Sequence, residues 1–471
     1  MITETELNSK RIADQATSTD EFILKDLIET HDTREMERGV KYYNNKNDIK
    51  KRKIYYYDEH GNKREDSEAI NHRVSHNWHK LLVDQKISYL LGKPAVINAD
   101  PEQFAEVLND WLGEDWDDML QEIGKGSSSK GVEYLHPFID EEGNFDYVVI
   151  PAEQVIPIYD TDYEKNIVSA IRYYPFWVNG RETVRAEWWD SEEVKYFIKT
   201  ESGMYVMEEP EEGGKNPDSH FYYNDRGYGW GKVPFIEFRN NEEKYSDLQF
   251  YREIIDTYDL IISNRVNTIE DIQNIFYVLK GYDGTSLAEF NQNLRYYRAA
   301  KVSEEGGIET VQGDAPVEAE DSTLDRMEEN IFLFGQGVNI KTDKFGQSPS
   351  GVALKFLFHL LDLKSNIMAR KFAKGMKNFI WFLSEYLGIS GKYAVPQDAL
   401  NTVNVTFSKS MPVNELEMVQ MAQASKGIIS DQTIVSNHPW VEDASWEKEQ
   451  MEGERQERVD LNDFADEEDE E

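Results

Sequence analysis

The segment SDLQFYREIIDTYDLIISNRVNTIEDI, residues 246–272, decides the fold. Apolar residues recur in it every three or four positions, which is the repeat of one helix face: Leu248, Tyr251, Ile255, Tyr258, Ile262, Val266, Ile269 and Ile272. In residues 281–316 glycines and short strand-like pieces interrupt the pattern, and a helix is predicted again over residues 322–335. Two helices on either side of a small insert predict a helical hairpin that carries a subdomain at its tip.

A polar loop and a long helix are predicted after this hairpin. The loop, residues 339–351, presents Lys341 and Lys344 in an otherwise acidic chain. The helix, predicted over residues 350–387, would be roughly 55 Å long, which is unusual for a globular protein. One stripe along it is apolar: Val352, Phe356, Leu360, Leu363 and Ile367.

The rest of the chain combines helices and strands. Helices are predicted from the capping box at Ser18 to about Tyr42, and over residues 72–91 and 101–123. Between residues 132 and 238 the apolar period changes to two, which predicts a hairpin and then an antiparallel meander. The hairpin covers residues 133–150, and the further strand candidates are residues 167–174, 183–189, 194–199 and 204–208. A strand over residues 403–407 and helices over residues 414–426 and 430–436 complete an α+β chain.

The length, net charge and cysteine content of the chain exclude several classes of function. The 471 residues predict two to four domains. With 51 Lys and Arg against 90 Asp and Glu, the formal net charge is −39, which argues against a sequence-reading DNA binder and against docking on anionic membranes. The absence of cysteine removes disulfides, thiolate zinc sites and cysteine nucleophiles. No apolar run is long enough to span a membrane, and aromatic residues at 12% predict a folded chain with a large polar surface.

The sequence contains few residues in patterns typical of catalysis, phosphate binding or metal binding. The run GKGSSSKG, residues 124–131, lacks the spacing of a phosphate-binding loop and is interpreted as a flexible loop before a strand. His72, His76 and His79 would share one face of a helix, but zinc needs a fourth ligand, so a solvated or interfacial histidine face is favoured over a metal site. No catalytic residue, cofactor or enzymatic activity is predicted.

Six motifs in order resemble the portal proteins of long-tailed bacteriophages. The resemblance covers most of the chain, and each motif lies on an element predicted above. The motifs are YYNNKNDI (42–49), SYLLGKP (88–94), VPFIEFRN (233–240), KFGQSPSGVALK (344–355), VTFSKSMPVN (405–414) and KGIISDQT (426–433).

The resemblance implies a portal-type subunit with an α/β wing, a helical stem hairpin, a small α/β clip, a long wing helix and a helical crown. The implied segments are the wing (1–245), stem helix (246–280), clip (281–318), returning stem helix (319–338), tunnel loop (339–351), long wing helix (352–400), crown region (401–450) and an acidic, disordered tail (451–471). In the tunnel loop, the residues expected to contact DNA are Lys341, Thr342, Lys344, Gln347 and Ser348.

The resemblance also implies the function. Portal subunits form a ring of about twelve copies, or thirteen when isolated, at one capsid vertex of the virion. Double-stranded DNA passes through the ring without sequence specificity during packaging and ejection. The implied partners are the terminase motor, the major capsid and scaffolding proteins and a head–tail adaptor. Assembly with them is expected in the host cytoplasm, and no membrane is expected as a partner. Two alternatives stay open: another head–tail adaptor or minor head protein, and a metal-dependent enzyme that uses the three histidines.

Overall fold

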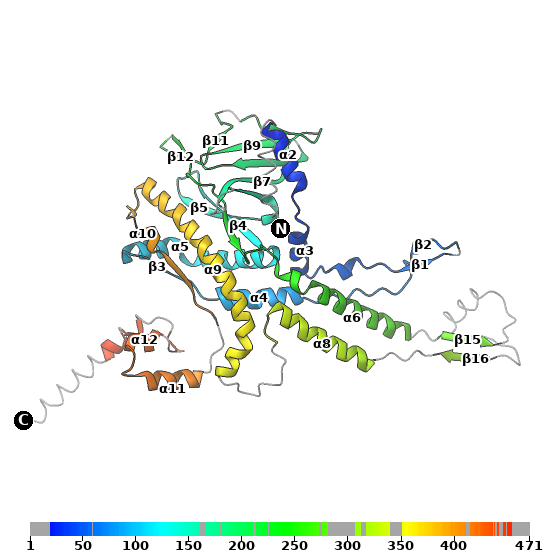
Figure 1. Cartoon of the computed structure of the whole chain (residues 1–471). Helices are drawn as coiled ribbons and strands as arrows, with labels where there is room; N and C mark the ends of the chain where they lie inside the picture. Colours follow the sequence, from blue (N-terminus) through cyan, green and yellow to red (C-terminus); the bar gives the residue numbers. More distant parts are fainter. Residues whose placement is uncertain are drawn as a thin grey trace, which may run out of the picture. The chain divides into compact units, whose positions relative to one another are not determined.

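The computed structural model describes residues 19–58, 60–160, 166–178, 180–210, 213–224, 226–272, 276–280, 307–311, 317–339, 351–396, 398–410 and 415–436, with short pieces between 438 and 454. The chain divides into two units. Unit 1 comprises Met1–Gly337 and Leu363–Lys409, and unit 2 comprises Val338–Asp362 and Ser410–Glu471. The described residues mix helices and strands (Figure 1), as the α+β prediction expects.

Unit 1 begins with two helices where the sequence predicts one. These are α2 (Asp20–Thr30) and α3 (Arg34–Tyr43), and His31 between them is extended. The backbone N–H of Arg34 donates to the carboxylate of Asp32, so this side chain competes with helical bonding at the break. The 3₁₀ turn η1 (Asp48–Lys51) and a small ribbon of β1 (Tyr55–Tyr57) and β2 (Lys63–Glu65) follow.

The run GKGSSSKG, predicted to be a flexible loop, instead forms the last turns of α5 (Glu102–Lys130), which kinks at Gly113. Small residues are needed there because neighbouring segments approach closely. A Cβ on Gly124 would lie 2.8 Å from the Leu91 side chain of α4 (Trp78–Leu91). A Cβ on Gly39 of α3 would lie 1.7 Å from the carbonyl oxygen of Ser129. The loop prediction was wrong because small residues also serve close helix packing.

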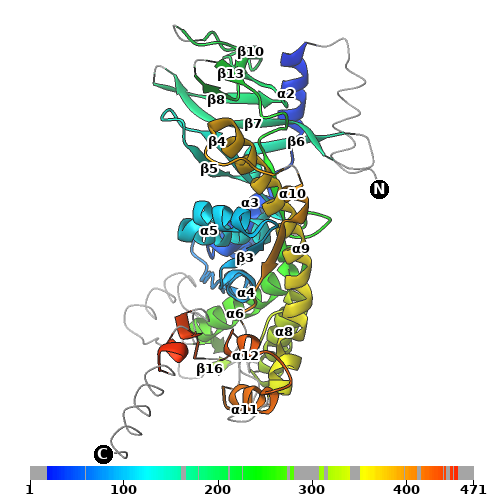
Figure 2. The same cartoon turned by 90° about the vertical axis from the view of Figure 1, so that its left-hand side faces the viewer.

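The predicted hairpin and meander are confirmed. The meander is antiparallel, and its strands pair in the order of the sequence from β6 to β10. Leu24 and Leu27 of α2 pack against Ile171 and Phe197 on one face of this sheet (Figure 2). The strands are β4 (Val132–Ile139), β5 (Phe145–Ile150), β6 (Val155–Tyr159), β7 (Ile167–Val178), β8 (Arg181–Trp189), β9 (Glu193–Lys199) and β10 (Tyr205–Met207), with β11 (Asp218–Ser219) on β9, the pair β12 (Phe221–Tyr223) and β13 (Arg226–Tyr228), and β14 (Ile236–Arg239) on β4.

The long helix α9 (Gly351–Ser390) is confirmed, and its second half forms much of the core of unit 1. Phe379 stacks on Trp116 of α5, with ring centroids 4.5 Å apart. Beyond α9, the helix α10 (Ala399–Thr402) leads to β17 (Asn404–Phe407), which pairs with β3 (Ala95–Asn98). Residues 401–409 therefore belong to unit 1, although they were predicted to open the C-terminal region.

The described C-terminal part of unit 2 contains α11 (Glu415–Ser425) and α12 (Asp431–Ser436), as the sequence predicts. Several large apolar side chains of this part are exposed, among them Ile428 and Trp440. In the predicted acidic tail, residues 455–471 lie outside the described residues.

The packing of α3 on α5 gives the first prediction. Gly39→Ala should lower the free energy of unfolding by about 2 kcal/mol or more, because the new methyl group meets the backbone carbonyl of Ser129. The matched control is Gly388→Ala in α9, where a Cβ has nothing within 4 Å. There the better helix propensity of alanine should stabilise by up to about 1 kcal/mol. Chemical denaturation measures both variants, and a stabilised Gly39→Ala variant would contradict this packing.

Candidate functional site

The helical hairpin predicted from residues 246–272 is present. Its two helices, α6 (Arg252–Ile272) and α8 (Val317–Gly335), pack against each other. Two antiparallel strands, β15 (Phe276–Lys280) and β16 (Gly307–Val311), continue from them and begin and end the insert (Figure 1). Residues 281–306 of the insert lie outside the described residues.

A row of buried polar side chains anchors α6 to the rest of unit 1. Asp259, Ser263 and Asn267 are spaced four residues apart, so they line one side of the helix. They accept hydrogen bonds from the backbone N–H groups of His76 (3.0 Å), Val74 (3.0 Å) and His72 (2.7 Å), in that order. We call this set the polar ladder.

The polar ladder can form because the spacing of alternate residues in an extended chain matches the spacing of every fourth residue in an α-helix. Every second residue of an extended chain is about 6.7 Å further on, and every fourth residue of an α-helix is about 6 Å further on. Residues 72–76 therefore present alternate N–H groups to successive turns of α6. These N–H groups lie outside any helix or sheet, and the α6 side chains satisfy them.

The three histidines do not share a helix face, contrary to the prediction. Helix α4 begins only at Trp78, so His72 and His76 lie in the extended segment. Each has its own partner: Glu270 for His72, Asp259 for His76 (2.7 Å) and the Tyr251 hydroxyl for His79 (2.7 Å). Burial lowers the pKa of His79 to about 3, so its ring is neutral.

The described residues offer no metal site. Within them, no group of three or more His, Asp or Glu side chains is placed to hold a metal ion. The weak metal candidate of His72, His76 and His79 depended on a helix that starts further along the chain.

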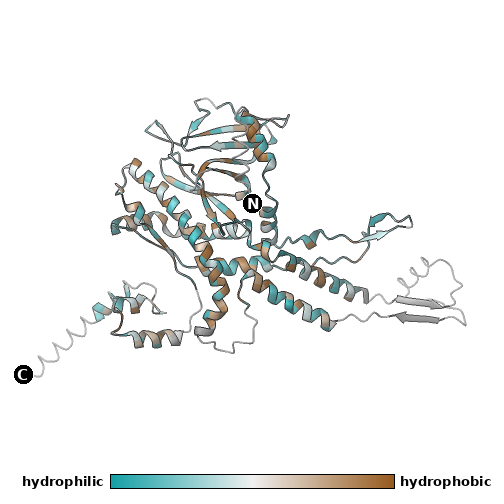
Figure 3. Ribbon diagram, in the orientation of Figure 1, coloured by the Kyte–Doolittle hydropathy of each residue, from teal (hydrophilic) through white to brown (hydrophobic). Residues whose placement is uncertain are grey.

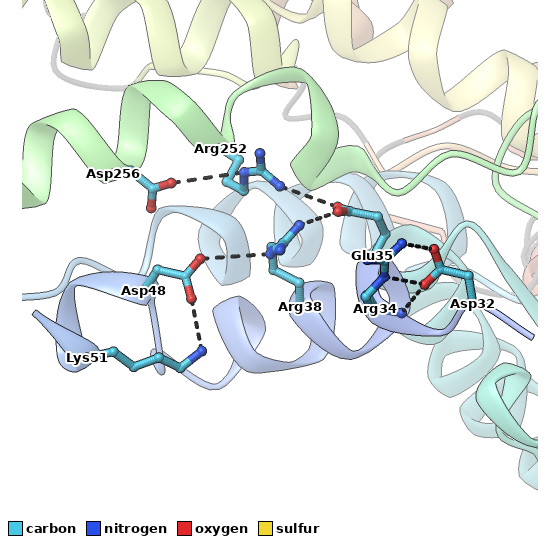
Figure 4. A network of polar contacts seen from close by, with 8 residues as sticks. All are labelled: Asp32, Arg34, Glu35, Arg38, Asp48, Lys51, Arg252 and Asp256. Atoms are coloured by element: carbon cyan, nitrogen blue, oxygen red, sulfur yellow. Dashed lines mark hydrogen bonds and ion pairs between the residues drawn. The ribbon is translucent and has the colours of Figure 1, made fainter. Parts of the chain in front are cut away.

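An ion-pair network ties the start of α6 to α3 and η1 (Figure 4). Glu35 of α3 lies between Arg38 and Arg252, and it accepts from Arg252 at 3.4 Å. Arg38 also pairs with Asp48 (3.8 Å), and Arg252 with Asp256 (4.0 Å). These side chains are partly exposed, so each pair adds little stability alone. Together they link the N-terminal end of α6 to α3 and η1.

A second, buried ionic cluster also lies at the base of the hairpin, where the chain enters α6 and leaves α8. Asp247, in the 3₁₀ turn η3 (Asp247–Phe250), accepts from Lys86 of α4 (2.6 Å) and pairs with Lys364 of α9 (3.1 Å). Asn240 accepts from Lys86 and donates to Asp247. Lys364 also donates to the carbonyl oxygen of Gly335, at the C-terminal end of α8 (2.9 Å).

Two cations share one carboxylate in this cluster. Burial lowers the pKa of Lys86 to about 8, partly offset by Asp247. Burial alone would raise the pKa of Asp247, but the ammonium groups of Lys364 and Lys86 hold it well below its ordinary value. The negative end of the α8 dipole gives Lys364 a second favourable partner. The cluster therefore links α4, the C-terminal end of α8 and α9.

The exposed side of α8 is acidic. Glu318, Asp321, Asp325 and Glu329 are exposed and follow one another at spacings of three and four. Arg265 of α6 pairs with Asp321 across the hairpin.

The predicted DNA-contacting residues Lys341, Thr342, Lys344, Gln347 and Ser348 lie outside the residues that the structure describes. The structure does describe both sides of this loop, to Asn339 after α8 and from Gly351 at the start of α9.

Comparisons with known proteins agree with the resemblance. The family model described as "Phage portal protein, SPP1 Gp6-like" matches residues 24–460. This chain belongs to that phage portal protein family. It is 39% identical to the portal protein of Bacillus phage SPP1 over 450 residues, which cover 95% of this chain and 88% of that protein. It is 31% identical to the portal protein of Clostridium phage phiCD119 over 432 residues, covering 87% of this chain and 90% of that protein.

Membership in the portal family makes this chain a structural protein of the phage virion, with roles in the capsid and in DNA packaging. It also decides against the alternative of another head–tail adaptor or minor head protein. In the part of the chain that the structure describes, no helix is both long and apolar enough to cross a membrane.

Sequence reasoning missed both anchors of the hairpin. The polar ladder leaves a readable signal, because polar residues at a spacing of four interrupt the apolar side of residues 246–272. The cluster around Asp247 leaves none, since Lys86, Asp247 and Lys364 are far apart in the sequence and resemble surface residues.

The buried cluster gives the second prediction. Asp247→Asn removes the carboxylate that the buried Lys86 and the largely buried Lys364 share, and should lower the free energy of unfolding by about 3–5 kcal/mol. The pKa of Asp247 is depressed in the folded state, so its stabilising effect is complete at neutral pH and is lost as the pH falls below its ordinary value of 3.8.

Chemical denaturation of the unsubstituted protein and of the Asp247→Asn variant between pH 3 and pH 7 measures how the difference in their free energies of unfolding depends on pH. The control is Asp32→Asn, which breaks an exposed pair with Arg34 and should change stability little. Equal effects of the two substitutions would contradict the role given to the buried cluster.

Proposed function

We propose that this chain assembles into a closed ring of about twelve copies at one capsid vertex, as the channel for DNA packaging and ejection. The observation that carries the proposal is the α6–α8 hairpin with its strand-paired insert, in a chain that belongs to the portal family. The polar ladder fixes α6, and Asp247 fixes the base of the hairpin. Such a fixed hairpin is suited to form one segment of a channel wall.

In this proposal the segments have the following roles. α6 descends through the stem, the insert forms the clip, and α8 returns. Residues 339–351 form the tunnel loop at the narrowest part of the channel. The second half of α9 lies in the wing, and the chain after Lys409 forms a short crown.

The charge of the chain suits the passage of DNA. About twelve copies of −39 sum to roughly −470, and a wall that shares this charge repels phosphate. Repulsion keeps the duplex from sticking, whereas a basic wall would bind it. Because the Debye length is about 8 Å at physiological salt, only charges close to the DNA act on it. The acidic side of α8 supports this arrangement.

A few cations on the tunnel loop would touch the phosphate backbone weakly and without sequence preference. Lys341 and Lys344 are the residues proposed for this contact, with Thr342, Gln347 and Ser348 beside them.

The remaining roles belong to proposed partners. The terminase would supply ATP hydrolysis and dock on the clip, and a head–tail adaptor would attach the tail. Major capsid and scaffolding proteins would surround the ring, which would assemble in the host cytoplasm before it becomes part of the virion.

Native mass spectrometry and electron microscopy of the purified chain test the proposal. We expect closed rings of about twelve or thirteen copies with a central channel. A protein that stays monomeric or dimeric at micromolar concentration would overturn the proposed function.

The third prediction concerns the loop lysines. Lys341→Glu combined with Lys344→Glu reverses two charges per subunit, so phosphate would meet only repulsion at the narrowest ring. We expect normal rings, with packaged DNA that is shorter or poorly retained. The double variant Lys93→Glu and Lys125→Glu, which reverses two exposed lysines of unit 1, is the control and should package normally.

Ring assembly and packaged DNA length are measured together for both double variants. Intact rings with full-length DNA would rule out a role for Lys341 and Lys344 in DNA contact. Failed rings would place the two lysines at a subunit contact instead.

A further inference from the structure

The first half of α9 is apolar on two sides. One side is buried in the chain itself, with Leu361 and Met368 covered. The other side carries the stripe predicted from the sequence, but Phe356 (76%), Leu363 (45%) and Ile367 (52%) are exposed. Figure 3 colours long stretches of α9 as hydrophobic. Large apolar side chains exposed together on one side of a helix mark an interaction surface, so this exposed side needs a cover.

A second exposed apolar patch lies at the C-terminal end of α8. Leu333 and Phe334 are both 54% exposed, although Ile331 and Phe332 beside them are buried. The adjacent Gly335 packs on Leu82 of α4, so the end of α8 is fixed while Leu333 and Phe334 are directed away from this contact.

The unit 1 part of the α9 stripe lies close to the α8 patch. The hydrogen bond from Lys364 to the carbonyl oxygen of Gly335 places Leu363 and the end of α8 side by side. The patches nevertheless do not cover each other within one chain, since both stay about half exposed. A rotation about a ring axis brings surfaces of similar height together, so a neighbouring copy can bring one patch onto the other.

Charged and polar side chains around the two patches match in the same register. On α8, Glu329 and Asp325 lie four and eight residues before Leu333. On α9, His359 and Lys355 lie four and eight residues before Leu363, and both are exposed. If the two helices pack in parallel with Leu333 beside Leu363, Asp325 lies opposite Lys355 and Glu329 opposite His359.

We infer that the exposed stripe of α9, formed by Phe356, Leu360, Leu363 and Ile367, is the docking surface for the C-terminal half of α8 from a second copy of this chain. This contact rests on the proposed ring. It joins two different surfaces, as a closed ring of identical subunits requires.

Cross-linking tests this contact directly, because the chain contains 0 cysteines. Two single variants, Leu333→Cys and Leu363→Cys, are purified, mixed, assembled and treated with a short bis-maleimide. We expect a covalent dimer when the two variants are mixed, and no covalent dimer when either variant is assembled alone.

Phe22→Cys provides the matched control, since Phe22 of α2 is 59% exposed and belongs to neither patch. Its mixture with Leu363→Cys should give no dimer. Intact rings in which the Leu333→Cys and Leu363→Cys mixture gives no dimer would overturn the inference and leave the proposed function standing. Absence of rings from the unsubstituted chain would instead overturn the proposed function.

A charge swap gives an independent readout. Asp325→Lys and Lys355→Asp should each raise the concentration needed for half-assembly by about tenfold, and the two substitutions together in one chain should restore assembly. Both side chains are on helix surfaces, so circular dichroism should show unchanged folding. Unchanged assembly in both single variants, or no recovery in the double variant, would contradict the proposed register.

Discussion

The carboxylate of Asp247 brings together segments that lie far apart in the sequence. Lys86 reaches it from α4 and Lys364 from α9, and Lys364 also binds the end of α8. Two ammonium groups out of water need an anion and well-placed acceptors, and this site supplies the anion, Asn240 and a helix C-terminus. Removing the anion would leave buried positive charge. The placement of the hairpin base therefore depends on this cluster.

The polar ladder extends the same principle along α6. Buried polar groups are expensive unless they are paired, and here an extended segment and a helix satisfy each other through matched repeats. Such bonds specify one position along the helix, because a shift by one residue would leave both the N–H groups and the side chains without partners. The ladder therefore fixes the position of α6 against residues 72–76.

Apolar surface and charge have different roles in this chain. The core of unit 1 is built from large apolar side chains of α5 and α9, while further apolar side chains on α8 and α9 stay exposed. Exposed apolar surface in a strongly acidic subunit favours association at specific patches, because the net charge opposes non-specific contact. The ring proposed here uses apolar contact for assembly and acidic charge for the channel.

The sequence by itself determined the kinds of elements and their order. Periodicity predicted the hairpin helices, the meander and the long helix, since each buries one side against a partner and the repeat of apolar residues records which side. Six motifs in order indicated the family, and the family comparison confirmed it. Periodicity could not say what covers each apolar stripe, so it did not foresee that Phe356 and Leu363 stay exposed in one chain.

Only the tertiary structure decided the roles of residues whose partners are distant. The glycines and serines of residues 124–131 look like a loop until α3 and α4 are packed against them, because a missing side chain serves flexibility and close packing equally. His72, His76 and His79 look like one cluster until the start of α4 is known. Lys86 and Asp247 look like surface charges until the fold buries them together. Local sequence records propensity and period, whereas burial and pairing depend on contacts between segments that lie far apart in the sequence.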